Sequence, residues 1–151
     1  MNPVALIKVF LHTLYTWLMA NLLNPLFFLF FILLTEGASL DEPLTRIFLY
    51  SLFSVVSLPC LAVGWICLSV IRYAEYLPSA KFLLWLVTAP LLIFFEFLLI
   101  SFMLNEKMEE IFLFMLPSLA AVVLAIIIRY HAFKKTICPA IIPVSENPSM
   151  L

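Results

Sequence analysis

The sequence is poor in glycine, cysteine and charged residues. Among its 151 residues, 2 are Gly, 3 are Cys and 11% are charged. Two glycines leave no Gly-rich phosphate-binding loop, and three cysteines do not build a multi-bridge disulfide scaffold. Soluble domains carry about 25% charged residues, so a soluble globular domain and a disordered tail are both excluded. The net charge is −1, and we therefore expect no nucleic-acid partner.

Apolar residues make up 66% of the chain, and the mean hydropathy is +1.18. A helix needs about 20 apolar residues to cross the hydrocarbon core of a bilayer. Backbone polar groups in hydrocarbon must be paired, so each spanning segment must be helical. The sequence therefore predicts an all-α integral membrane protein, a four-transmembrane-helix antiparallel bundle embedded in the lipid bilayer. The predicted spans are 13–35, 44–71, 80–104 and 111–128.

The first apolar segment is longer than a span requires. Pro3–Thr35 would extend about 50 Å as one helix, against about 30 Å for the bilayer core. Lys8, His12 and Thr16 recur every four residues and form one polar stripe. We therefore expect residues 1–12 to form an amphipathic N-terminal extension, at or projecting from the membrane surface, before the first span begins.

The segment after the fourth span, residues 130–151, is basic and then rich in proline. Three prolines in its second half preclude a regular helix there, and several apolar residues accompany them. For Thr136–Leu151 we consider two alternatives, a frayed and partly extended end or a strip that docks on this protein or on a partner.

Basic residues predict the orientation in the membrane. Loops rich in Lys and Arg stay in the cytoplasm, which places both termini there. Tyr73, Tyr76, Trp85 and Tyr130 fall near the same interface, where aromatic rings prefer to lie. We expect a multi-pass protein of a bacterial cytoplasmic (inner) membrane. The predicted inner side holds Lys8, Arg72, Lys81, Arg129, Lys134 and Lys135, and the outer side holds Arg46 and Lys107.

Glu96 is an ionisable residue inside the third predicted span. It precedes Leu104, the end of that span, by eight residues, which is about 12 Å along a helix. A charge at such a depth costs about 2.5–3.5 kcal/mol on insertion scales, and burial without a cation favours the neutral carboxyl. Counting residues from the outer end of each of the other spans places several polar side chains at a depth similar to that of Glu96. We predict an intramembrane polar cluster of Glu96, Asn24, Ser54, Ser57 and Ser118, with Ser51 near it.

This cluster has three alternative meanings. A neutral Glu96 can join two helices through one hydrogen bond, which is worth about 0.6 kcal/mol on average. It can instead bind a proton or a cation, or it can face a basic residue of another subunit.

Small residues indicate where helices pack closely. Ala121 and Ala125 form a small-x-x-x-small pair on the fourth span, and Gly64 lies on the second. Each predicted span also contains one proline, which removes a backbone hydrogen bond and is either an ordinary membrane-helix proline or a hinge. These prolines are Pro25, Pro59, Pro90 and Pro117.

The sequence gives little support for metal binding or for catalysis. Cys60 and Cys67 are seven residues apart, too far along one helix for joint ligation, and we expect no metal and no cofactor. An enzyme needs a convergent set of acid, base or nucleophile, so we expect no enzyme.

We expect a protein that acts by lateral helix–helix interaction, with another membrane protein or with itself. It would be an accessory or assembly subunit or a membrane-embedded, immunity-type inhibitor. The alternative is an oligomeric proton- or cation-coupled small transporter that uses Glu96.

Overall fold

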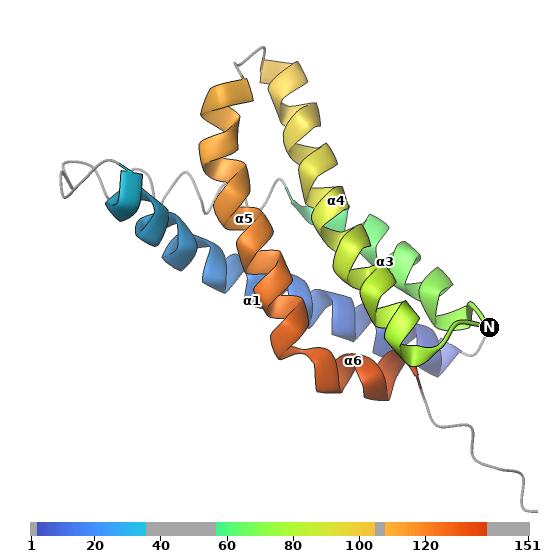
Figure 1. Ribbon diagram of the computed structural model, residues 1–151. Coiled ribbons are helices and arrows are strands. Elements are labelled where there is room, and N and C mark those ends of the chain that lie inside the picture. Colours follow the sequence, from blue (N-terminus) through green and yellow to red (C-terminus); the bar gives the residue numbers. More distant parts are fainter. Residues whose placement is uncertain (1–2, 36–56, 105–107, 139–151) are drawn as a thin grey trace, which may run out of the picture.

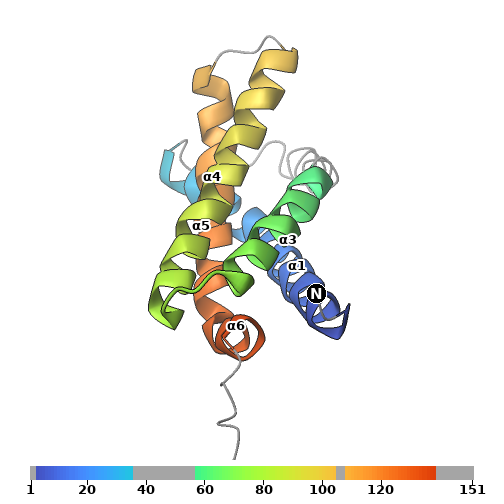
Figure 2. The ribbon, with the colours of Figure 1, turned by 90° about the vertical axis from the view of Figure 1, so that its right-hand side faces the viewer.

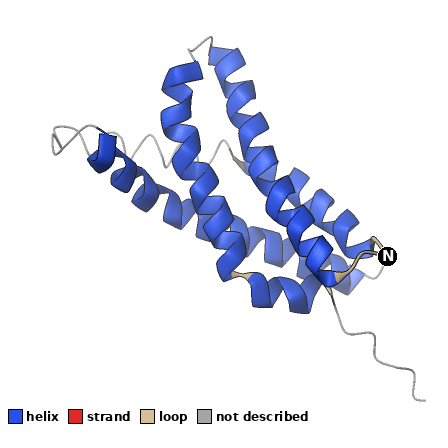
Figure 3. Cartoon of the chain, in the orientation of Figure 1, coloured by secondary structure: helices blue, strands red, loops and turns tan. Residues whose placement is uncertain are grey.

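The structure is a computed structural model that describes residues 3–35, 57–104 and 108–138 (Figures 1 and 3). This part of the chain is helical and contains no strand. Two of its helices are long and apolar enough to cross a membrane, or three if the bent pair α5–α6 counts as one span. The helices are α1 (Pro3–Thr35), α3 (Leu58–Tyr73), α4 (Pro78–Leu104), α5 (Met108–Ile128) and α6 (Tyr130–Ile137).

The four longer helices pack in a ring. α1 contacts α5, α5 contacts α4, α4 contacts α3, and α3 contacts α1. The most extensive of these contacts joins α1 and α5, which cross each other at a wide angle in Figure 1. Within the described residues, no close backbone contact joins α1 to α4 or α3 to α5 across the ring. Opposite helices of the ring are therefore separated at the level of the backbone, with side chains and cavities between them.

Two helices follow the predicted spans closely. α4 begins two residues before the predicted 80–104, and α5 begins three residues before the predicted 111–128. Pro90 and Pro117 lie inside these helices without ending them, as Pro25 does in α1.

The predicted N-terminal extension falls at the start of α1. α1 is one helix of 33 residues from Pro3 to Thr35, so the backbone shows no boundary at residue 12. In the predicted polar stripe, His12 and Thr16 are buried in the bundle while Lys8 is exposed. Two of the three polar residues therefore face other helices, which keeps this part of α1 in line with the rest.

Helix α3 occupies the second half of the second predicted span, 44–71. Ser57 takes a turn conformation, and α3 begins after it, with Pro59 in its first turn. Proline suits a first helical turn, where its missing N–H is not needed. α3 has 16 residues and measures about 24 Å, which is shorter than the bilayer core. The earlier part of this span, 44–56, lies outside the described residues.

Helix α6 is a feature that the sequence prediction missed. It bends away from α5 by 64° and contacts α1, α3, α4 and α5. In Figure 2, α6 is viewed nearly end-on while α4 and α5 run up the picture, so α6 lies across the end of the bundle. Phe133 and Ile137 of α6 are each 1% exposed, whereas Lys134 and Lys135 are exposed. The first part of the predicted tail is therefore an amphipathic helix, and residues 139–151 lie outside the described chain.

The largest core cluster lies at this same end. It joins α6 to α1, α3, α4 and α5, and Trp65, Phe82 and Leu86 pack against its surface. Its members are Val9, Leu68, Ile71, Trp85, Ala89, Ile126, Phe133 and Ile137.

Several hydroxyl side chains on the helices donate to the backbone of their own helix. The hydroxyl of Thr16 donates to the His12 carbonyl at 2.8 Å, and that of Ser69 donates to the Trp65 carbonyl at 2.8 Å. Thr13 and Thr88 bond the carbonyl four residues back in the same way. Such local bonds let a hydroxyl enter apolar surroundings without a partner on another helix.

Candidate functional site

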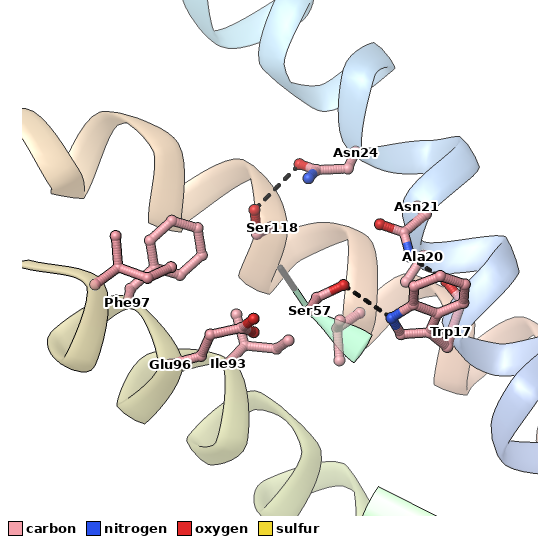
Figure 4. Close-up of a pocket in the computed structure, with 11 residues that line it drawn as sticks. Trp17, Ala20, Asn21, Asn24, Ser57, Ile93, Glu96, Phe97 and Ser118 are labelled. Carbon is pink, nitrogen blue, oxygen red and sulfur yellow. Dashed lines mark hydrogen bonds between the residues drawn. The ribbon is translucent and has the colours of Figure 1, made fainter. Parts of the chain in front are cut away.

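A polar cavity of about 40 Å³ lies between α1, α4 and α5, at the level where α3 begins. Figure 4 shows its side chains projecting from these helices toward one another. Of the predicted polar cluster, Glu96, Asn24, Ser57 and Ser118 all line this cavity. Ser51 and Ser54 lie outside the described residues. The remaining lining residues are Trp17, Ala20, Asn21, Ile93, Phe97, Ile100 and Val122.

Hydrogen bonds across the cavity connect α1 to its neighbours. Ser118 Oγ lies 3.3 Å from Asn24 Oδ1 and 3.0 Å from the Phe114 carbonyl oxygen, so its single proton is shared between α1 and its own helix. The indole N–H of Trp17 donates to Ser57 Oγ at 2.9 Å. α1 is therefore held by polar contacts to α5, through Asn24, and to the start of α3, through Trp17 two turns earlier.

Glu96 projects from α4 into the cavity and is half-buried (Figure 4). The Cys60 thiol of α3 lies beside its carboxyl group, and Cys60 Sγ is 3.8 Å from the Leu92 carbonyl oxygen. No Lys or Arg of the described residues lines the cavity. A volume of about 40 Å³ exceeds the roughly 10–15 Å³ that one water requires. The arrangement thus has room for a water or a small cation among amide, hydroxyl and carboxyl groups.

A second cavity, of about 60 Å³, continues the first toward α6. The two share four lining residues, Trp17, Ala20, Ile93 and Val122. Gly64 lines the second cavity, where a Cβ atom would lie 3.5 Å from Trp85 and 3.6 Å from Thr13. These are ordinary van der Waals distances, so Gly64 lies where three helices meet but has room for a methyl group.

The predicted packing pair lies on a buried face of α5. Ala121 is 1% exposed and Ala125 is fully buried, whereas the neighbouring Ala120 is exposed. Small side chains let helix backbones approach closely, and α5 makes the most extensive helix contact of the described chain, with α1.

Sequence reasoning missed Trp17 and Asn21 as members of the polar cavity. Asn21 Nδ2 donates to the Trp17 carbonyl at 3.0 Å, and both residues line the cavity. Together with Asn24 they occur at intervals of four and three residues, which places them on one face of α1. This spacing was the available signal, since counting depth finds the level of a residue but not its direction around the helix.

A second polar contact, between Arg129 and His12, lies toward α6. Arg129 Nη2 is 3.5 Å from His12 Nδ1, and its guanidinium carbon lies 5.3 Å from the centre of the Tyr15 ring. Buried Arg129 Nε has no hydrogen-bond partner within the described chain. Arg129 occupies the bend between α5 and α6, so its contacts with α1 hold that bend in place.

Among the described residues, no three His, Cys, Asp or Glu side chains come together. No known protein family, curated protein or solved structure matches the chain. The argument for function therefore depends on the helices, the two cavities and the surfaces themselves.

Proposed function

We propose that the chain is a small multi-pass membrane protein that acts by lateral contact of its helices with another membrane protein. It would serve as an accessory or assembly subunit, or as a membrane-embedded inhibitor. One observation carries the proposal: α1 and α4, the two helices long enough to span a membrane, bury only 22% and 11% of their apolar windows. Most of their apolar side chains are therefore available to lipid or to a partner.

The exposed faces of α1 and α4 are continuous and bulky. On α4, Leu91, Phe95, Leu99 and Phe102 follow one another at intervals of four, four and three residues, and Phe102 is 86% exposed. On α1, the exposed face includes Leu18, Leu22, Leu26 and Leu29. Apolar surface alone does not drive helix association in lipid, so a partner must match these side chains by close packing.

Other surfaces of the described chain are small. The connection between α3 and α4 has four residues, 74–77, and a single residue separates α5 from α6. Recognition by a domain outside the membrane would need a larger polar surface than these connections provide. The helix faces are the largest surfaces that the described residues offer to a partner.

The proposal includes four spans with both termini in the cytoplasm of a bacterium. Every Lys and Arg of the described chain lies toward the α6 end, and basic residues favour the cytoplasmic side. The second span would need residues from 44–56 in addition to α3, because α3 alone is too short to cross the bilayer.

Photo-crosslinking in the native membrane tests the partner-binding proposal. A photoreactive phenylalanine analogue would replace Leu22 on α1, Phe95 on α4 or, as a control, Phe97, which is 5% exposed. We expect a discrete heavier adduct from Leu22 or Phe95 and none between chains from Phe97. Adducts with lipid alone at both exposed positions would refute lateral binding, and an adduct of twice the mass would identify a second copy as the partner.

The cavity around Glu96 favours a second candidate function, proton- or cation-coupled transport by an oligomer. Here the carboxyl group has space beside it, polar neighbours and no Lys or Arg among the residues that line the cavity. In a transporter, such a group would exchange a proton for a cation.

Flux measurements with Glu96→Gln in liposomes separate the two candidates. Gln keeps a hydrogen-bonding group but does not titrate, so coupled flux should fall to the background of empty liposomes while partner binding persists. Glu75→Gln is the matched control, because Glu75 is exposed in the connection between α3 and α4. Absence of flux in the wild-type protein, or equal flux in both variants, would argue against the transport function.

A further inference from the structure

Four basic side chains gather where the C-terminal ends of α3 and α6 meet the start of α4. We call this group the basic junction, and its members are Arg72, Lys81, Lys134 and Lys135. The Arg72 guanidinium donates to the Thr136 carbonyl of α6. Lys81 Nζ donates to the Arg72 carbonyl at 2.7 Å. These two contacts hold the ends of three helices together.

The basic junction consists of an inner pair, Arg72 and Lys81, and an outer pair, Lys134 and Lys135. The two pairs differ in burial and in hydrogen bonding. Lys81 is only 9% exposed, and its bond to a helix-end carbonyl gives it an internal role. Cations at helix C-termini are stabilised by the partial negative charge there. Lys134 and Lys135, in the last turn of α6, are exposed, and their side chains make no hydrogen bond or salt bridge with a described residue. Their positive charges are therefore free to meet an external anion.

Acidic residues hardly offset this charge. Glu75, in the connection after α3, is exposed, and it forms no salt bridge with a described residue. Glu96 lies far along α4, and the two acids of α5 lie in its first turn, at the opposite end of that helix from α6. Counting the described residues alone, the basic junction thus keeps a net positive charge.

Aromatic residues at the same end indicate a membrane interface. Tyr73, Tyr76 and Tyr130 are 48%, 59% and 40% exposed. Amphipathic rings of this kind settle at the level of lipid headgroups. α6 buries Phe133 and Ile137 in the bundle and turns its lysines outward, so it lies where headgroups would cover the end of the bundle.

We propose that the basic junction binds the phosphate of an anionic phospholipid headgroup, with Lys134 and Lys135 as the direct contacts. The two inner cations add positive potential and fix α6 against α3 and α4. A lipid surface fits better than a soluble anion, because the exposed tyrosines and the apolar helix faces already place this end at a bilayer interface. This inference is independent of the proposed partner and of transport through Glu96.

Native mass spectrometry of the full chain in detergent tests this inference. The protein would be titrated with phosphatidylglycerol or phosphatidylcholine carrying the same acyl chains. We expect selective retention of phosphatidylglycerol. The double variant Lys134→Gln/Lys135→Gln should retain it about 30-fold less well, at about 1 kcal/mol for each basic residue near an anionic surface. Lys134→Arg/Lys135→Arg should bind like the wild type.

Controls separate the basic junction from overall charge and from free phosphate. Arg46→Gln/Lys107→Gln removes the same two charges from residues that the sequence predicts on the opposite side, and it should leave retention unchanged. The proposal is overturned if the wild type retains both lipids equally, or if the Lys134/Lys135 and Arg46/Lys107 variants lose binding alike. Displacement of phosphatidylglycerol by millimolar inorganic phosphate would also overturn it, by showing a site for a soluble anion.

Discussion

Replacement of Phe133 by Ala is expected to lower the free energy of unfolding by about 3–5 kcal/mol. Phe133 is 1% exposed and belongs to the largest core cluster. Its ring centre lies 5.4 Å from that of Phe82 and 6.0 Å from that of His12, so it joins α6 to α4 and α1. Truncation would leave a cavity that these helices do not fill. Unfolding of the detergent-solubilised protein by added SDS, followed by circular dichroism, measures the change.

A matched variant on the same helix controls for the loss of an aromatic side chain. His131 is exposed on α6, so His131→Ala should change the free energy of unfolding by less than about 0.5 kcal/mol. Equal stability of Phe133→Ala and His131→Ala would mean that α6 does not seal the end of the bundle.

Ala121→Leu should destabilise the protein by about 1–3 kcal/mol, because it overfills a closely packed face. Ala121 is 1% exposed on α5, the helix that makes the most extensive contact with α1. The larger side chain would force these helices apart or out of their preferred rotamers. The same SDS titration measures the effect.

The neighbouring Ala120 provides the comparison. It is exposed, so Ala120→Leu adds the same side chain to the outer surface and should stay within about 0.5 kcal/mol of the wild type. Comparable destabilisation by both substitutions would indicate that side-chain size on α5 matters regardless of the face.

The sequence predicted the lengths of α4 and α5 well, because polar residues on both sides of an apolar run limit where a membrane-spanning helix can begin and end. It also brought Glu96, Asn24 and Ser118 to one level, since rise per residue is constant in a helix. It did not find Trp17, because direction around the helix depends on which neighbours α1 meets. Helix packing decides which neighbours α1 meets. In so apolar a chain, the spacing of polar and apolar residues carries little information about that packing.

The beginning of α3 and the existence of α6 were missed for a related reason. Pro59 was compatible with a helix interior or a first turn, and only the turn at Ser57 distinguishes them. Phe133 and Ile137 are four residues apart, as expected for one helical face. Their burial requires an apolar surface formed jointly by the ends of α1, α3 and α4. That apolar surface exists only once the helices have packed together.

The pairing of α1 with α5 has a consequence for biosynthesis. α1 comprises residues 3–35, and its main partner, residues 108–128, emerges from the ribosome only after α3 and α4. Until α5 arrives, α1 must wait in the membrane with the polar face that carries Asn24 still without its contact to Ser118. The insertion machinery or a neighbouring protein would shield that face during translation, and a pause between α4 and α5 would lengthen this exposed interval.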